Sequence, residues 1–380
     1  MDARTIADPI PLAQALMRCP SVTPAEAGVL DVAQRELENL GFEIRRMKFG
    51  VVDNLYARLG SAQPNFCFAG HLDVVPPGEG WASDPFAAEI RNGNLYGRGA
   101  ADMKTAIAAM IAATQNFLVN GQPRGSISFL LTCDEEGPAV DGTKRLLAAL
   151  TESGEKLDHC LVGEPTGEGR VGDTIKNGRR GSLNVVITMD GKQGHVAYPQ
   201  RAINPVTPLL ETLHALKSRR LDEGSPGFDP SNLEVTSIDV GNPAHNVIPR
   251  QATAKLNIRF NINHTGDALL AWITETAQAN AERYRATCAL KISSRSEPFY
   301  TAPGAFTDLL SAAVKESFGF APQLATTGGT SDARFIKDYA QVAELGLRNE
   351  TAHMTDEHCA VEDVRTLARC YEAVLRRYFA

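Results

Sequence analysis

The spacing of apolar residues predicts an alternation of strands and helices in the first part of the chain. Helices are expected over residues 9–18, 25–40, 103–118 and 141–150, and strands over residues 42–48, 54–59, 66–70, 126–133 and 159–163. Asn92-Gly93 marks a hairpin turn between two further short strands. The alternation predicts an α/β fold with a mostly parallel sheet flanked by helices.

After Lys176 the rhythm changes to that of an α+β domain. Strands are expected over residues 182–190, 233–240, 252–260 and 287–294, and helices from Asn204-Pro205 to about residue 219 and from Thr265 to Tyr284. This order is the ferredoxin-like pattern. The α/β pattern then resumes, with helices near 305–318 and 362–378 and a strand near 341–345. We therefore expect one domain formed by residues 1–178 and 295–380, with an inserted domain over residues 179–294.

Composition narrows the class of protein. The chain has 380 residues, a length that favours two domains, and its hydrophobic and charged contents of 43% and 22% are ordinary for a globular protein. A net charge of -7 without a basic block argues against nucleic acid and membrane partners. No signal peptide or membrane span is expected. The seven cysteines are scattered and never form CxxC, which favours a reduced, cytoplasmic protein.

Metal-type side chains follow three buried strands. His71 ends the run FCFAGH, Glu136 follows LLTCDE, and Glu164 follows CLVG. Loops after parallel strands converge at one edge of a sheet, where Asp102, at the head of a long helix, and His353 could join them. Two histidines and three carboxylates suit zinc. Because five ligands exceed the need of one tetrahedral ion, the set favours two metals, roughly 3.5–4 Å apart.

Each of these residues also has an ordinary interpretation. Asp102 could be a helix N-cap, and Glu135 with Glu136 could form a solvated acidic turn. Glu164 could belong to a turn before Pro165, and His353 could be a surface histidine. All of these ordinary interpretations would have to be true at once, whereas a metal site explains the whole ordered set of residues. The sequence therefore favours the metal site.

Long motifs give the chain a family resemblance. HLDVVP from His71, GRGAADMK around Asp102, DEEGPAVDGT around Glu135 and EP at Glu164 resemble the dizinc deacylase and exopeptidase family of aminoacylases and carboxypeptidases. EEGPAVDGT, KNGRRGSLNV, GHVAYP, HNVIP and TTGGTSDARFI are similar to its bacterial branch that cleaves N-succinyl-L,L-2,6-diaminopimelate to succinate and L,L-2,6-diaminopimelate in lysine and cell-wall precursor biosynthesis. The resemblance covers nearly the whole chain. It implies an α/β catalytic domain and an inserted dimerisation domain, hence a homodimer.

The resemblance also implies a ligand set for two Zn²⁺ ions per subunit, with Co²⁺ possible in the second site. His71, Asp102 and Glu164 would hold one ion. Asp102, Glu136 and His353 would hold the other, with Asp102 as the bridge. The metals would activate a water and polarise the amide carbonyl.

Three further residues take catalytic roles through the same resemblance. Glu135 would be the general base that takes a proton from the attacking water and passes it to the leaving amine. Asp73 would align His71. His195, from the inserted domain of the partner subunit, would donate to the oxyanion. The family also has a cis peptide after the bridging aspartate, here Asp102–Met103.

A succinylated diaminopimelate carries several carboxylates, so a small anionic substrate is expected, and guanidinium groups suit it. The substrate-binding positions implied by the resemblance are Arg179, Tyr198, Asn246, Arg259, Gly329, Thr330, Ser331 and Asn349. An ordinary surface ion pair is the alternative for each arginine. The flank of Asn349 departs from the family pattern at Leu347-Arg348 and at Thr351 to Met354, and Cys133 replaces a more usual hydroxyl residue.

Three other functions compete with this interpretation. Acetylornithine deacetylation would use the same chemistry on a different acyl amino acid. A nucleotide-binding protein could use GRGAAD, although that stretch lacks the third glycine of the dinucleotide motif. A protein that binds zinc without turnover would not need Glu135 beside its ligands.

Overall fold

The computed structural model describes residues 7–380, so residues 1–6 of the expected first domain lie outside the described part. The chain divides into two compact units, each described by itself. Unit 1 comprises the chain up to Asn177 together with Thr301–Ala325 and Ser331–Ala380, and unit 2 comprises Gly178–Tyr300 and Thr326–Thr330. Within residues 7–380 no helix has both the length and the apolar character needed to cross a membrane.

Unit 1 is built on an eight-stranded sheet of order β1-β2-β6-β3-β7-β18-β8-β17. The strands are β1 (Glu43–Phe49), β2 (Val52–Leu59), β3 (Asn65–His71), β6 (Ser126–Thr132), β7 (His159–Val162), β8 (Thr174–Lys176), β17 (Gln323–Ala325) and β18 (Gln341–Glu344). The central strands β6, β3, β7 and β18 are parallel to their neighbours within this group. A smaller three-stranded sheet consists of β19 (His358–Ala360), β5 (Asn94–Tyr96) and β4 (Glu89–Arg91).

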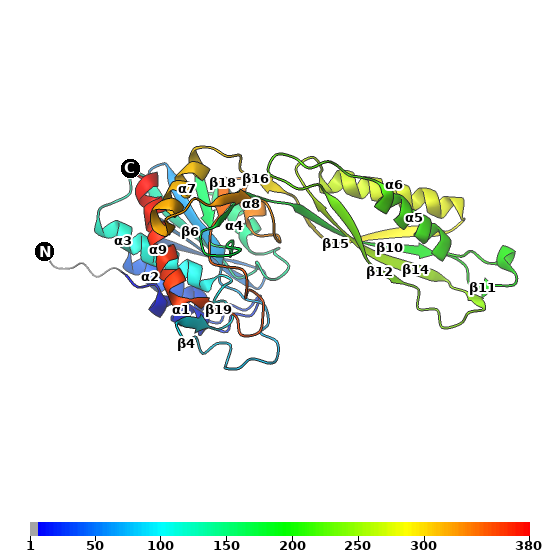
Figure 1. Cartoon of the computed structure of the whole chain (residues 1–380), viewed down its shortest axis with the longest axis horizontal. Coiled ribbons are helices and arrows are strands. Elements are labelled where there is room, and N and C mark those ends of the chain that lie inside the picture. Colours follow the sequence, from blue (N-terminus) through cyan, green and yellow to red (C-terminus); the bar gives the residue numbers. More distant parts are fainter. Residues whose placement is uncertain (1–6) are drawn as a thin grey trace. The chain divides into compact units, whose positions relative to one another are not determined.

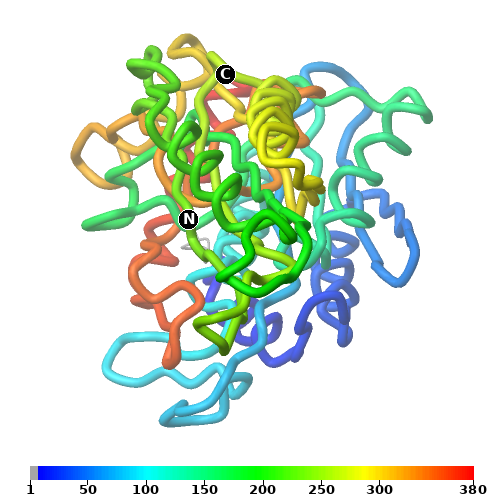
Figure 2. The backbone as a smooth tube through the Cα atoms, turned by 90° about the vertical axis from the view of Figure 1, so that its right-hand side faces the viewer, coloured from blue at the N-terminus to red at the C-terminus, as the bar shows by residue number. Residues whose placement is uncertain are grey.

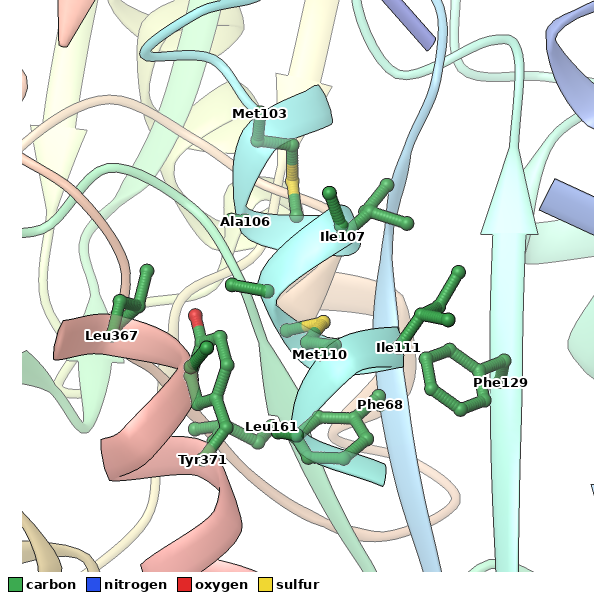
Figure 3. Close-up of a cluster of buried hydrophobic side chains, with 14 of the residues drawn as sticks. Phe68, Met103, Ala106, Ile107, Met110, Ile111, Phe129, Leu161, Leu367 and Tyr371 are labelled. Carbon is green, nitrogen blue, oxygen red and sulfur yellow. The ribbon is translucent and has the colours of Figure 1, made fainter. Parts of the chain in front are cut away.

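Helices cover this sheet. They are α1 (Ile10–Met17), α2 (Val29–Asn39), α3 (Lys104–Val119), α4 (Thr143–Glu152), α7 (Ala305–Phe318), α8 (Ala333–Ile336) and α9 (Val361–Tyr378). The alanine-rich α3 lies beside α9 (Figure 1). Its alanine side chains let it pack closely between α9 and the strands, and Figure 3 shows Ala106 there together with the larger Ile107 and Met110. The ring of Phe68 from β3 lies 5.4 Å from that of Phe129 and 5.6 Å from that of Tyr371.

Unit 2 holds a four-stranded antiparallel sheet of order β12-β14-β10-β15 with two helices. The elements are β10 (Gly181–Asp190), α5 (Val206–Ser218), β12 (Asn232–Asp239), β14 (Gln251–Phe260), α6 (Gly266–Arg283) and β15 (Thr287–Ser296). Short pieces are β9 (Gly178–Arg179) with β16 (Phe299–Tyr300), β11 (Gly194–His195) with β13 (Val247–Ile248), and a 3₁₀ turn at Pro199–Arg201. Helices α5 (green) and α6 (yellow) pack together (Figure 2). The strand order is that of a ferredoxin-like fold.

The predicted fold class, an α/β sheet with an α+β insert, is confirmed. Every longer predicted element is present, and Thr265 caps α6 by accepting a hydrogen bond from the Ala268 amide at 3.2 Å. The short strands β8, β9, β16 and β17 and the helix α8 were not predicted, because two to four residues are too few to show a period. Strand β15 runs to Ser296, and the second join between the units follows Tyr300.

Candidate metal centre

Three neighbouring parallel strands bring the first ligand-type residues together. Strand β3 lies between β6 and β7, so their carboxyl ends meet at one edge of the sheet. His71 is the last residue of β3, Glu136 follows β6, and Glu164 follows β7. Strand β3 is buried along its whole length, as expected for a central parallel strand with both faces covered.

Glycines directly before two of these residues allow close packing around Asp102. A Cβ atom on Gly163 would lie 2.8 Å from the Cε atom of Met103 and 3.0 Å from the Cβ atom of Ala106. A Cβ atom on Gly70 would collide with the same Met103 Cε atom. Met103, the residue after Asp102, therefore packs onto the two strand ends that carry His71 and Glu164. The peptide between Asp102 and Met103 is cis.

The first group of potential ligands is His71, Asp102 and Glu164, which are 1%, 8% and 7% exposed. The Nε2 atom of His71 lies 3.1 Å from Oδ1 of Asp102 and 3.7 Å from Oε1 of Glu164. The Nδ1 atom of His71 lies 2.9 Å from the backbone oxygen of Asp73. Because a carbonyl only accepts hydrogen bonds, this contact places a proton on Nδ1 and turns Nε2 toward the carboxylates.

The second group is Asp102, Glu136 and His353. The Nε2 atom of His353 lies 2.7 Å from Oε1 of Glu136 and 3.4 Å from Oδ2 of Asp102. Asp102 therefore turns one carboxylate oxygen to each histidine. The His353 side chain is 50% exposed, and its backbone has a φ of 62°, in the left-handed region. In each group the ligand atoms lie within 4.8 Å of one another.

This geometry disagrees with the ordinary interpretations of these residues. The N-cap of α3 is Met103, without a side-chain cap, so Asp102 is not a capping residue. The Glu136 side chain is 8% exposed, so Glu136 is not a solvated turn residue. Glu164 is buried and does not lie in a turn. His353 is exposed but bonded to two carboxylates, which an ordinary surface histidine is not.

The electrostatics of the cluster fit two cations. The hydrogen bonds of His353 to Asp102 and Glu136 raise its pKa to about 10. Burial opposes ionisation of Asp102, yet the hydrogen bonds from His353 and His71 hold its pKa well below the ordinary value. Burial also opposes a charge on His71, but Asp102 raises the pKa of that ring overall. The raised pKa values show that the carboxylates stabilise a positive charge on each histidine ring. Divalent ions would bind the same carboxylate oxygens.

Glu135 lies beside the cluster without belonging to either ligand group. Burial, together with the charges of Asp332 and Glu136, raises the pKa of Glu135 to about 8 against the opposing effect of His71. Its position depends on Asp73, whose carboxylate accepts the backbone N–H groups of Glu135 at 3.3 Å and Glu136 at 3.1 Å. The Asp73 carboxylate lies 3.7 Å from His71 Nδ1, so the ring donates its hydrogen bond to the Asp73 backbone oxygen and not to the carboxylate.

Comparison with known proteins assigns the chain to a family. The model of peptidase family M20/M25/M40 matches residues 67–377. The chain belongs to this family. The resemblance drawn from the sequence motifs is therefore confirmed.

Relatives within this M20 family match nearly the whole chain. A protein of Maricaulis maris named succinyl-diaminopimelate desuccinylase is 58% identical over 377 residues, 98% of this chain and 96% of that protein. Proteins with the same name from Caulobacter vibrioides and Parvibaculum lavamentivorans are 58% and 53% identical, with the same two coverages.

Solved structures of the M20 fold resemble the chain at lower identity. An aminopeptidase of Bacillus cereus is 21% identical with a TM-score of 0.82 and covers 98% of each chain. A metallo-carboxypeptidase of Sulfolobus solfataricus is 18% identical with a TM-score of 0.77 and covers 100% of this chain and 99% of that one. These two likenesses bear on the fold alone.

The other residues expected from the M20 resemblance lie in both units. In unit 1, Ser331 is buried and its hydroxyl donates to the Glu344 carboxylate. Asn349 is exposed, and its backbone N–H donates to the Gly167 oxygen at 3.1 Å.

In unit 2, the expected residues form two groups. His195, Tyr198 and Asn246 are exposed near the paired strands β11 and β13, with the Val196 amide donating to the Asn246 oxygen at 3.0 Å. Arg179 is buried, and its Nη1 atom donates to the Gly329 oxygen at 3.1 Å, next to Thr330 in the chain. The buried Nη1 atom of Arg259 has no hydrogen-bond partner within the described residues.

Two buried residues next to the metal centre, Arg98 and Glu357, escaped the sequence interpretation. They form an ion pair at 2.7 Å with almost no exposed side chain. Their only sequence signal was position, since Arg98 stands inside GRGAAD and Glu357 follows His353 by four residues. In the sequence alone, charged residues near a ligand cannot be distinguished from surface residues, because only the fold shows that they are buried.

Proposed function

We propose that the chain is a succinyl-diaminopimelate desuccinylase. It hydrolyses the amide bond of N-succinyl-L,L-2,6-diaminopimelate to succinate and L,L-2,6-diaminopimelate. The cluster of two histidines and three carboxylates with Glu135 at its side carries the assignment of hydrolysis. The substrate is inferred from the relatives of that name, which are 53–58% identical over 98% of the chain.

The cluster would hold two zinc ions, with Co²⁺ as the alternative in the second position. His71, Asp102 and Glu164 are the ligands of the first ion, and Asp102, Glu136 and His353 those of the second. Such ions, when bound, lower the pKa of water and polarise the amide carbonyl. Nitrogen and carboxylate donors in both groups support this choice of metal.

The residues of the chain supply proton transfer. Glu135 takes a proton from the attacking water as its oxygen bonds to the amide carbon, and gives that proton to the nitrogen as the C–N bond breaks. Burial raises the pKa of Glu135, which favours the protonated form that must exist between the two steps. Asp73 keeps Glu135 in place through its hydrogen bonds to the following backbone. His195 of a partner subunit donates to the oxyanion.

The residues proposed to bind the substrate fit an anion. Arg259 is half-buried, its Nη1 atom has no hydrogen-bond partner within the described residues, and Arg180 adds a second positive charge nearby. A substrate carboxylate would satisfy such a guanidinium. The other residues proposed to bind the substrate are Arg179, Tyr198, Asn246, Gly329, Thr330, Ser331 and Asn349.

A homodimer in the cytoplasm completes the proposal. The role of His195 requires a second copy of the chain, so a monomer with full activity would contradict that role. All seven cysteines are free and five of them are buried, with 0% exposure at Cys67, Cys133, Cys160 and Cys370, which is consistent with a reducing compartment.

The test is a hydrolysis assay of N-succinyl-L,L-diaminopimelate and N-acetylornithine side by side, with the metal content measured on the same sample. We expect a clear preference for the succinyl substrate, about two metal ions per chain, and loss of activity after chelation that zinc restores. Preference for acetylornithine would overturn the substrate. Full activity in a metal-free sample would overturn the metal assignment.

A further inference from the structure

The carboxylate of Glu357 is surrounded by the backbone that leads to Asp102. Glu357 is 0% exposed. Its Oε1 atom accepts the backbone N–H groups of Ala101 at 2.8 Å and Asp102 at 3.0 Å, and its Oε2 atom accepts that of Gly99 at 3.2 Å. Its backbone oxygen accepts the N–H group of Gly97 at 2.9 Å. One residue thus holds the turn from Gly97 to Asp102.

The glycines of this turn make the arrangement possible. Gly97 and Gly99 have φ values of 149° and 88°, in a region that side chains with a Cβ atom rarely adopt. These values let successive N–H groups point to one place, as in backbone nests that bind anions. The anion bound here is the Glu357 carboxylate, so the amides of GRGAAD are not available to a phosphate. The nucleotide-binding alternative for this stretch is therefore wrong.

Arg98 connects the same carboxylate to the loop that carries His353. Its Nη1 atom donates to Oε2 of Glu357 at 2.7 Å and to the backbone oxygen of Met354 at 3.2 Å. Its Nη2 atom donates to the backbone oxygen of Pro77 at 3.2 Å. Met354 follows His353 directly, so the guanidinium holds this loop one residue away from a proposed ligand.

We propose that the buried Glu357–Arg98 pair is the positioning device of the second metal site, holding Asp102 and His353 in register with each other. Neither side chain is a ligand. Glu357 fixes the backbone of Asp102, and Arg98 fixes the loop behind His353. This inference rests on the proposed metal function of the cluster.

The two metal sites depend on this pair to different degrees. His71 ends one buried strand and Glu164 follows another, and the glycines before them pack against Met103, so we expect these two ligands to keep their places without the pair. His353 stands in a loop, in the left-handed region and half exposed, so its orientation depends on the hydrogen bonds of that loop. Loss of the pair should therefore weaken the second site more than the first.

The experiment is a titration of the metal-free full chain with Zn²⁺, in competition with a chelator, on the wild type and on Glu357→Gln. The substitution keeps the size of the side chain but replaces one acceptor oxygen by a donor that faces backbone N–H groups. We expect the affinity of the weaker binding step to fall about 10- to 100-fold and the tighter step to change much less. With Co²⁺, the visible absorption of the second ion should change and that of the first should not.

Glu155→Gln is the matched control. Glu155 pairs with Arg58 in unit 1, with side chains only 10% and 18% exposed, and lies 3.5 Å from Asn65, at the opposite end of β3 from His71. It should lower the thermal stability without changing either binding step. Equal weakening of the second step by both substitutions would make the role of Glu357 merely structural and overturn the inference.

Three further outcomes bear on the inference. Unchanged metal binding in Glu357→Gln would overturn it. If that variant does not fold, Arg98→Lys, which keeps the charge but loses donors to Met354 or Pro77, should weaken the second step in the same direction, and no change would overturn the inference. Two-ion binding by a wild type that does not hydrolyse the succinyl substrate would overturn the proposed function and leave the positioning role intact.

Discussion

The two groups of ligand-type residues share Asp102 but are built in different ways. The first adds His71 and Glu164, which stand at the ends of buried parallel strands and pack through their preceding glycines against Met103. The second adds Glu136 from the turn after β6 and the half-exposed His353 from a loop. One is held mainly by a close-packed core, the other by hydrogen bonds among loops.

This difference indicates how far each site is preorganised. A ligand on a buried strand can move only if the core around it moves. A loop ligand is held by its local contacts, and those around His353 include a buried ion pair whose arginine donates to the Met354 oxygen. We therefore expect the first site to bind metal more tightly and the second to respond to substitutions in loops. The following experiments test that contrast, from the largest expected effect to the smallest.

The largest effect on activity should come from a residue that belongs to neither site. Glu135→Gln removes the proposed proton carrier while it keeps the size of the side chain, so kcat should fall about 10²- to 10⁴-fold. Metal titration should still give both binding steps. Persistence of wild-type turnover would show that another group is the base, and loss of either ion would place Glu135 among the ligands.

Removal of one unshared ligand from each group should separate the sites. Glu164→Ala should abolish the tighter binding step, and His353→Ala the weaker one, each leaving about one bound ion in place of two. The number of ions and their affinities are measured by titration with metal analysis. If both substitutions removed the same step, the division of the cluster into two groups would be wrong.

A glycine before a strand-end ligand should affect the first site through packing alone. In Gly163→Ala, the new methyl group would lie 3.0 Å from the Cβ atom of Ala106 and closer still to the Met103 side chain. We expect the free energy of unfolding to fall by about 1–3 kcal/mol. The tighter metal step should weaken, because Met103 and Asp102 must shift. Gly154→Ala is the control: it lies at a positive φ with nothing within 4 Å, so it should cost stability without changing metal binding.

The smallest effect should come from unit 2, which carries none of the ligand-type residues. Asp222 accepts hydrogen bonds from the Gly224 amide at 2.7 Å, from the Asn261 side chain at 2.8 Å and from the Ser231 amide, and pairs with His264. Burial of Asp222 opposes its charge, but the hydrogen bonds from Ser231 and its other donors lower its pKa from 3.8 to about 2. Asp222→Asn should therefore lower the free energy of unfolding by about 1–2 kcal/mol near neutral pH.

The sign of the pH dependence follows from the lowered pKa of Asp222. The stabilisation is complete above the ordinary pKa of 3.8 and is lost as the pH falls toward the folded value of about 2. The difference in unfolding free energy between wild type and Asp222→Asn should shrink across that range in denaturant titrations. A constant difference would mean that the Asp222 charge contributes nothing. Metal binding at neutral pH should not change.

The sequence by itself determined the fold class and the metal-type residues. Apolar runs of full strand length and helices of eight residues or more show their period, so β3, β6, α3 and α9 could be read directly. A ligand-type residue just after a buried strand has a place in an α/β sheet, which is why His71, Glu136 and Glu164 were recognised together.

Only the tertiary structure decided how these residues are held. Pairing between strands set the order β6-β3-β7 and brought the ligands to one edge. Only the packed structure shows that Gly70 and Gly163 leave room for the Met103 side chain. In the sequence Glu357 is one charged residue among several, but in the structure it is buried and accepts three backbone N–H groups around Asp102. Such roles arise from contacts between segments that are distant in the chain, 255 residues apart for Asp102 and Glu357, and local patterns of residues carry no record of such contacts.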